Sequence, residues 1–312
     1  MEGILKARKS VRRARTVKKY LFLASIIGVQ LALFCFFYVG ISGGAVLMAF
    51  QKNTGGRAVL TLDHFKRFFD VFLHTSDIWI ALRNTFIFFF FGFVMLPISF
   101  ANSYFMYKKI WGYKIFRVLF FLPSVISMVV WSQIYGGIVG PQGPVARLFQ
   151  ILSGSEFPPH FLGDSRYALI FVILYSFWLG YAGSFILFGG ALSRIPESVI
   201  EAGKIDGVGW FRELVQVIIP LVWPTLSTML ILSLTGLFTA SGNIFLLTNG
   251  AFGTTTISFI IFQNTYNGGN MADLPPATQG YTAALGLVFT VLTIPLVFLT
   301  VKLLKKVEDV KY

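Results

Sequence analysis

Long apolar segments separated by short polar ones dominate the pattern of the chain. A helix needs about 20 apolar residues to cross the hydrocarbon core of a bilayer, and six segments meet this requirement. The predicted spans are approximately Tyr20–Met48, Ile78–Tyr104, Phe116–Ile138, Tyr167–Leu192, Leu214–Ala240 and Thr282–Leu303. A polar, amphipathic stretch at Asp63–Phe72 predicts a short interfacial helix. We therefore expect an all-α polytopic membrane protein with about six transmembrane helices.

Basic residues gather between the predicted spans and fix an orientation. Eight Lys and Arg residues lie between Lys6 and Lys19, and smaller basic clusters follow the second and sixth spans. Cytoplasmic segments carry an excess of such residues, and six crossings put all three clusters on one side. We expect a multi-pass protein of a plasma membrane with both termini cytoplasmic. The net charge of +13 is therefore a sign of topology and not of a nucleic-acid partner.

Charged residues are rare inside the predicted spans. Apart from Arg83 and Arg117 near span ends, none of the six segments contains a central Asp, Glu, Lys, Arg or His. Ion-coupled transporters and intramembrane enzymes need such groups as relays, ligands or catalysts, so another subunit is expected to supply energy. The lack of central cations also argues against a phosphorylated substrate and favours a neutral, hydroxyl-rich solute.

Motifs for catalysis and for cofactors are missing from the sequence. It contains no phosphate-binding G-x-x-x-x-G-K-[ST] loop, G-x-S-x-G elbow or H-E-x-x-H pair. The three histidines share no metal-ligand spacing, and Cys35 is the single cysteine. We expect no catalytic residue, metal or cofactor in this chain.

The loop between the fourth and fifth spans has the features of a short helix. Pro196 suits a first turn, where no backbone donor is needed, and Glu197 is favourable at that end through the helix dipole. Gly207 is a natural stop because it tolerates positive φ. Such a helix could enter a groove on another protein, or it could be an ordinary amphipathic interfacial helix.

The same loop carries a family resemblance. Glu201-Ala-Gly-Lys-Ile-Asp206-Gly207, followed by Pro220, resembles the EAA loop of binding-protein-dependent ABC permeases, which forms a coupling helix that docks into a cleft on the ATPase. The resemblance assigns an ATPase contact to Glu201, a close-packed face to Ala202 and Gly203, a brace to Asp206 and a turn to Gly207. Gly203 stands where the motif usually has Ala.

The resemblance extends over most of residues 75–305. Phe116–Ser127, Ser176–Gly180 and Gly280–Gly286 are similar to span signatures of sugar permeases. The set resembles the maltose-permease type, first of the paired subunits, and the polysaccharide-permease branch of Gram-positive bacteria. Asn249–Phe252 replaces a usual Gly-Gly-Pro, and Asn267–Gln279 is expected to be an extra outward segment.

What the resemblance implies is a permease with the type I ABC importer fold. The expected parts are a basic N-terminal segment (1–19), a first helix with an interfacial segment (20–74), a permease core (75–304) with a coupling loop (193–213), and a cytoplasmic tail (305–312). Implied partners are a second homologous permease, two ATPases that hold ATP and Mg, an extracytoplasmic solute-binding protein, a carbohydrate and membrane lipid.

Candidates for a substrate path come from the fourth and fifth spans. They are Trp178, Gly180, Tyr181, Ser233, Thr239 and Asn243. Aromatic planes could stack on sugar rings and hydroxyls could bond to sugar hydroxyls, or these side chains could only fill the bundle and bond between helices. The expected function is import of a carbohydrate, most naturally an oligosaccharide. The alternatives are a non-sugar solute, or a membrane enzyme acting on lipid-linked sugars.

Overall fold

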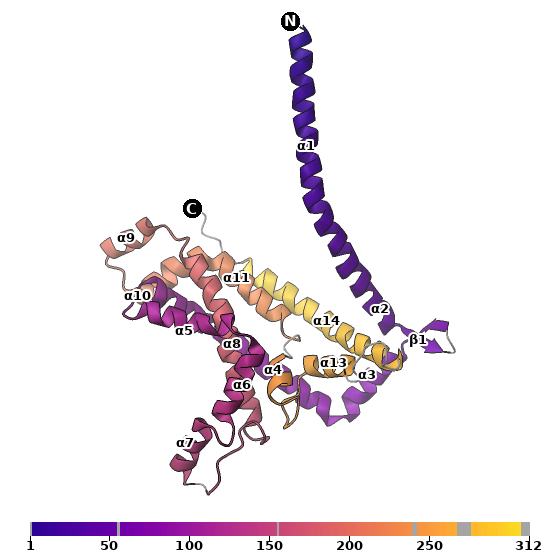
Figure 1. Ribbon diagram of the computed structural model, residues 1–312, viewed down its shortest axis with the longest axis vertical. Coiled ribbons are helices and arrows are strands. Elements are labelled where there is room, and N and C mark those ends of the chain that lie inside the picture. The colour runs from indigo at the N-terminus through magenta and orange to yellow at the C-terminus, as the bar shows by residue number, and fades with distance from the viewer. Residues whose placement is uncertain (1, 55–56, 155, 239–241, 267–275, 307–312) are drawn as a thin grey trace. The chain divides into compact units, whose positions relative to one another are not determined.

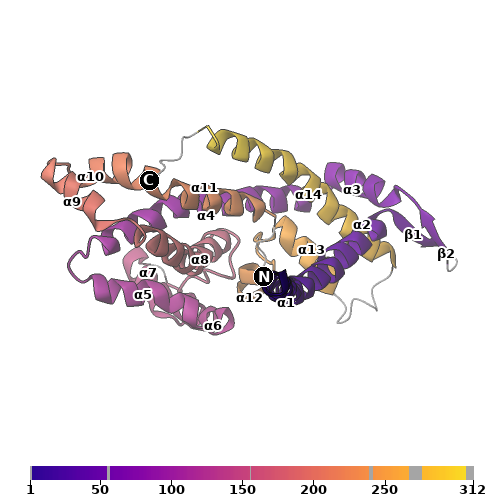
Figure 2. The same ribbon diagram turned by 90° about the horizontal axis from the view of Figure 1, so that it is seen from above.

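The computed structural model describes residues 2–54, 57–154, 156–238, 242–266 and 276–306. In these residues the regular secondary structure is helical except for one two-stranded hairpin, and turns and loops connect the helices (Figures 1 and 2). The chain forms two compact units: Met1–Phe68 with Leu274–Leu287, and Phe69–Asp273 with Val288–Tyr312.

The first unit begins with one long helical run. It consists of α1 (Glu2–Phe34), the π-helix η1 (Cys35–Ser42) and α2 (Gly43–Ala49). The apolar part, Lys18–Ala49, contains the predicted first span, and none of its most apolar window is buried inside the protein. This exposure is expected of a helix surrounded by lipid, since the apolar environment is then the bilayer.

A hairpin follows in the first unit, and after it comes a short helix that begins in the first unit and ends in the second. Strands β1 (Gln51–Thr54) and β2 (Arg57–Leu60) pair antiparallel, with Gln51 opposite Leu60. Helix α3 (Asp63–His74) confirms the helix predicted at Asp63–Phe72. Lys52 Nζ lies 3.0 Å from Asp63 Oδ2, and this hydrogen bond and charge hold the pKa of Asp63 below its usual value.

The second unit contains most of the remaining helices. They are α4 (Ser76–Tyr107), α5 (Tyr113–Val125), α6 (Met128–Val139), α7 (Pro144–Ser153), α8 (Ala168–Leu192), α9 (Glu197–Ile205), α10 (Trp210–Glu213), the π-helix η2 (Leu214–Ile218), α11 (Ile219–Thr235), α12 (Gly242–Leu247) and α13 (Ile257–Tyr266). The last helix, α14 (Pro276–Leu304), runs through both units. The central pair is α4 and α8, which pack more extensively than any other two elements. A hydrogen bond links the two helices: Ser103 Oγ on α4 donates to the Phe185 carbonyl on α8 at 3.1 Å.

The third predicted span is interrupted by a sharp bend. Phe116–Ile138 was expected to be one continuous helix, but the chain bends by 110° between Tyr113–Val125 and Met128–Ser153. Ile126 is extended, and the Ser127 side chain caps α6 by accepting from the Val129 amide at 3.3 Å. The described residues thus contain five continuous helices able to cross a membrane, or six spans if the bent pair forms one.

The fifth span also ends earlier than predicted. Its helix stops at Thr235, with Gly236 as the capping residue, whereas the sequence pattern extended it to Ala240. The last of these predicted residues, 239 and 240, lie outside the described part of the chain. The other four spans agree with the long helices to within a few residues.

Candidate functional site

Helix α9 has the start and the stop that the sequence predicted. Pro196 precedes it with φ −61° and ψ 136°, and Gly207 follows it with φ +68°. The Gly207 amide donates to the Lys204 carbonyl at 3.1 Å, and the Val208 amide donates to the Gly203 carbonyl at 3.0 Å. This pair of bonds is the Schellman arrangement, which needs a left-handed residue at the position of Gly207.

The two faces of α9 differ sharply in exposure. Glu201 and Ala202 lie on the outside, and Ile205 exposes 86% of its surface. Ile200, on the opposite face, exposes only 7%. An exposed isoleucine next to a small residue and an acid is an available contact surface for another protein.

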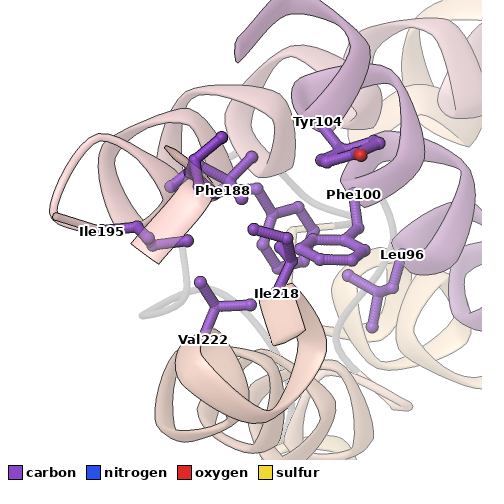
Figure 3. Packing of buried hydrophobic residues seen from close by; sticks show 9 residues of the cluster. Leu96, Phe100, Tyr104, Phe188, Ile195, Ile218 and Val222 are labelled. Carbon is purple, nitrogen blue, oxygen red and sulfur yellow. The ribbon is translucent and has the colours of Figure 1, made fainter. Parts of the chain in front are cut away.

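The inner face of α9 is anchored in a hydrophobic cluster that joins three long helices (Figure 3). Ile195 and Ile200 pack there with Leu96, Phe100 and Tyr104 of α4, with Phe188 and Leu192 of α8, and with Ile218 and Val222 at the start of α11. The rings of Phe100 and Phe188 meet edge to face at 5.5 Å. Closely packed interiors transmit displacement because they have few voids, so movement of α9 would move the ends of α4, α8 and α11.

A second attachment follows α9 in the chain. Lys108, at the end of α4, places Nζ 2.9 Å from both carboxylate oxygens of Glu213. The Tyr104 hydroxyl donates to the Trp210 carbonyl at 3.3 Å. Sequence reasoning did not identify Lys108 or Glu213, because 105 residues separate them and no local pattern connects them.

The remaining residues of the predicted coupling set lie around α9 and at the start of α11. Gly203 is half-buried, and Asp206 is exposed, with no side-chain hydrogen bond or ion pair to any described residue. The brace expected of Asp206 stays a prediction, and the Lys108–Glu213 pair is a separate contact of the same loop. Pro220 is the second residue of α11 and lies two residues after the end of η2. At the end of η2 the Ile219 amide donates to the Leu214 carbonyl, five residues earlier. A π-helical turn is a common local adjustment in helices at functional sites.

The predicted path residues partly converge on one cavity. Gly180, Ser233 and Asn243 line a cavity of about 270 Å³ bounded by α4, α8, α11 and α12. Asn243 Nδ2 donates to Ser176 Oγ at 2.8 Å. Four phenylalanines, including Phe88 and Phe177, supply much of the apolar wall. A few polar groups within an apolar wall are typical of a site for a small molecule.

Other predicted path residues lie elsewhere. Trp178 packs edge to face against Trp131 with ring centroids 4.4 Å apart, and Tyr181 is buried beside Met95 and Phe185. Neither of the two predicted aromatics lines the cavity. Thr239 falls outside the described residues.

Two polar residues of the cavity wall were not among the predicted path residues. Ser176 and Ser184 line the cavity together with Gly180. Residues four apart lie on one face of a helix, so the repeat of small residues at 176, 180 and 184 is a signal that could have identified them.

Comparisons with known proteins agree on one family. The model of the family described as "Binding-protein-dependent transport system inner membrane component" matches residues 93–309. The chain is 27% identical to the probable ABC transporter permease protein YurN of Bacillus subtilis over 61% of this chain and 63% of that protein. It is 28% identical to the multiple sugar-binding transport system permease protein MsmF of Streptococcus mutans, over 70% and 71% respectively.

A solved structure shares the fold. It is that of a bacterial ABC transporter involved in the import of the acidic polysaccharide alginate, with a TM-score of 0.75 and 18% identity. The alignment covers 95% of this chain and 99% of the other. At this identity the likeness concerns the fold alone.

Proposed function

Because the chain belongs to the family of binding-protein-dependent transport system inner membrane components, we propose that it is the permease subunit of an ATP-driven importer of carbohydrates. In this proposal the chain supplies the path and the coupling, and hydrolysis of ATP with Mg takes place in partner ATPases. A second, homologous permease and an extracytoplasmic solute-binding protein complete the assembly. Both termini and α9 lie on the cytoplasmic side.

The observation that carries the proposal is the hydrophobic cluster beneath α9. It joins α9 to α4, α8 and α11, and these three helices also line the cavity of about 270 Å³. On α4 the cluster begins at Leu96, next to the cavity residue Met95. A push on the outer face of α9 would therefore shift the walls of the cavity, which is what alternating access requires.

The character of the cavity supports a neutral polar solute. Among the described residues, its lining contains three serines, an asparagine, glycines and apolar side chains, and no Asp, Glu, Lys, Arg or His. Hydroxyl and amide groups can exchange hydrogen bonds with sugar hydroxyls, whereas a charged solute would need an opposite charge. MsmF, whose name describes multiple sugar-binding transport, supports a sugar as the cargo.

Co-purification tests the proposal. The tagged chain would be extracted gently from native membranes as wild type, as Glu201→Ala and as Glu156→Ala, which removes an exposed carboxylate far from α9 in the sequence. We expect an ATPase and a second permease to accompany the wild type and the Glu156 variant, and the ATPase to be lost from the Glu201 variant. A wild-type chain that purifies alone would refute the importer assignment. An ATPase that is retained equally by all three would refute the role of Glu201.

A further inference from the structure

A second, larger cavity opens beside the end of the second unit that carries α9. It has a volume of about 700 Å³ and is bounded by α4, α5 and α8. Ser193, which precedes Pro196 by three residues, is part of its lining, as is Lys109 just after α4. This cavity shares no residue with the smaller one described above.

One part of this cavity is positively charged. Lys109 and Arg117 line it, with Tyr113 one helical turn before Arg117. Neither cation forms an ion pair or hydrogen bond with any residue that the structure describes. The adjacent Lys108, by contrast, is neutralised by Glu213. Two uncompensated cations at one cavity favour an anion.

The backbone at Lys109 is unusual. Its φ of +53° lies in the left-handed region, where a helix usually ends on glycine because any other residue is strained there. Its amide donates to the Met106 carbonyl at 3.1 Å as part of the cap of α4. Lysine is thus kept where glycine would be more stable, which points to a use for its side chain.

The rest of the cavity is apolar and open. Met106, Phe121 and Ile186 are among its walls. A Cβ added at Gly189 or Gly190 would meet no atom within 4 Å, so close packing does not require these two glycines. They instead leave room within the cavity.

We propose that this cavity binds an anionic phospholipid. Lys109 and Arg117 hold the phosphate of its headgroup, and an acyl chain lies against the apolar wall around Phe121 and Ile186. A charged end combined with an apolar body matches a lipid better than a sugar, which has no acyl chain for that wall. In the orientation proposed above, the cavity faces the cytoplasmic leaflet, where anionic lipids attract basic residues.

Quantifying retained lipid tests the proposal without any transport assay. The protein, with whatever subunits accompany it, would be purified from native membranes and exchanged into nanodiscs of equal phosphatidylglycerol and phosphatidylcholine. Lipid that survives subsequent mild delipidation would be measured by mass spectrometry. Wild type is expected to retain about one phosphatidylglycerol per chain in preference to phosphatidylcholine. The pair K109Q/R117Q is expected to weaken this retention roughly 30-fold, since each basic residue near an anionic surface contributes about fivefold.

Two further variants make the result specific. Lys114→Gln removes a neighbouring exposed cation that does not line the cavity and should retain lipid like wild type. Gly190→Leu keeps both cations but fills the cavity, and it should lose the lipid. The proposal is overturned if wild type retains no excess phosphatidylglycerol, which would be the result if another subunit covered the cavity. It is also overturned if K114Q loses as much phosphatidylglycerol as K109Q/R117Q. The proposal would also be overturned if the protein retained no phosphatidylglycerol but bound inorganic phosphate or an oligogalacturonate. Such binding would show that the cavity is a site for a soluble anion.

Discussion

Lys108 Nζ lies 2.9 Å from both carboxylate oxygens of Glu213, and this pair fastens the end of α4 to α10. The Glu213 side chain is almost completely buried and that of Lys108 is mostly buried. Together with the hydrophobic cluster around Ile200, the pair anchors the segment from α9 to α10 against the long helices of the second unit. Helix α9 is thus packed at its inner face and exposed at its outer face.

Removal of the lysine is the first test of this attachment. Lys108→Met leaves the buried Glu213 carboxylate unpaired and should lower the free energy of unfolding by about 2 kcal/mol. Thermal unfolding of the purified protein in detergent would measure the change. Lys114→Met removes an exposed lysine that has no ion pair with any described residue; it is the control and should change stability little. Equal melting temperatures for wild type and Lys108→Met would contradict the role of the pair.

Two isoleucines of α9 allow a matched comparison. Ile200→Ala removes a buried side chain from the hydrophobic cluster and should destabilise the protein by about 2–4 kcal/mol. Ile205→Ala makes the same chemical change at a position that is 86% exposed and should leave unfolding unchanged. Ile205→Ala should instead weaken binding of the ATPase. If the two variants melted at the same temperature, the division of α9 into an inner and an outer face would be incorrect.

The turn after α9 depends on a glycine. Gly207→Ala places a side chain at φ +68°, which costs about 1 kcal/mol, and should reduce the ATPase activity of the assembled complex. Gly209→Ala is the control because Gly209 has φ −67° and no atom lies within 4 Å of its added Cβ. The rate of ATP hydrolysis by the Gly207→Ala and Gly209→Ala complexes, measured at equal protein concentration, tests this expectation. Loss of activity in both, or in neither, would contradict the role of the turn.

Two glycines of α8 test the smaller cavity. Gly180 lines it and Gly183 does not, and an added Cβ meets no atom within 4 Å at either position. Gly180→Leu should therefore abolish uptake of the carbohydrate by filling the cavity, whereas Gly183→Leu should permit it. Uptake of radiolabelled oligosaccharides by whole cells, corrected for the amount of each variant in the membrane, provides the comparison. Normal uptake by Gly180→Leu would show that the substrate takes another path.

Local signals made α9 and most spans predictable. The ends of α9 follow from Pro196 and Gly207, each of which acts on its own backbone. The bend in the third span could not be read in the same way, although Pro123 lies near it. Pro97 and Pro224 lie inside helices that continue past them, because helices in membranes tolerate proline. Proline alone therefore does not reveal which helix breaks.

The features of the site that the sequence did not predict depend on contacts between residues far apart in the chain. Lys108 with Glu213 and Ser176 with Asn243 are 105 and 67 residues apart, and only the packing of α4, α8 and α11 brings such residues together. In spans that are apolar on all sides, hydrophobic periodicity does not show which face is inward. Of the predicted path residues, Gly180, Ser233 and Asn243 line the cavity, whereas its other polar residues, Ser176 and Ser184, were not predicted.

The most direct test of the coupling mechanism follows the cavity while ATP is hydrolysed. In the native complex, Cys35→Ser would remove the single cysteine of this chain, and Ser233→Cys would place a reporter on the cavity wall. The rate at which a thiol reagent labels this cysteine would be measured with and without MgATP. The mechanism predicts that ATP changes the rate, that Ile200→Ala abolishes the change while the ATPase stays bound, and that Gly209→Ala does not. The same ATP-dependent change in the Ile200→Ala complex would contradict transmission through the hydrophobic cluster.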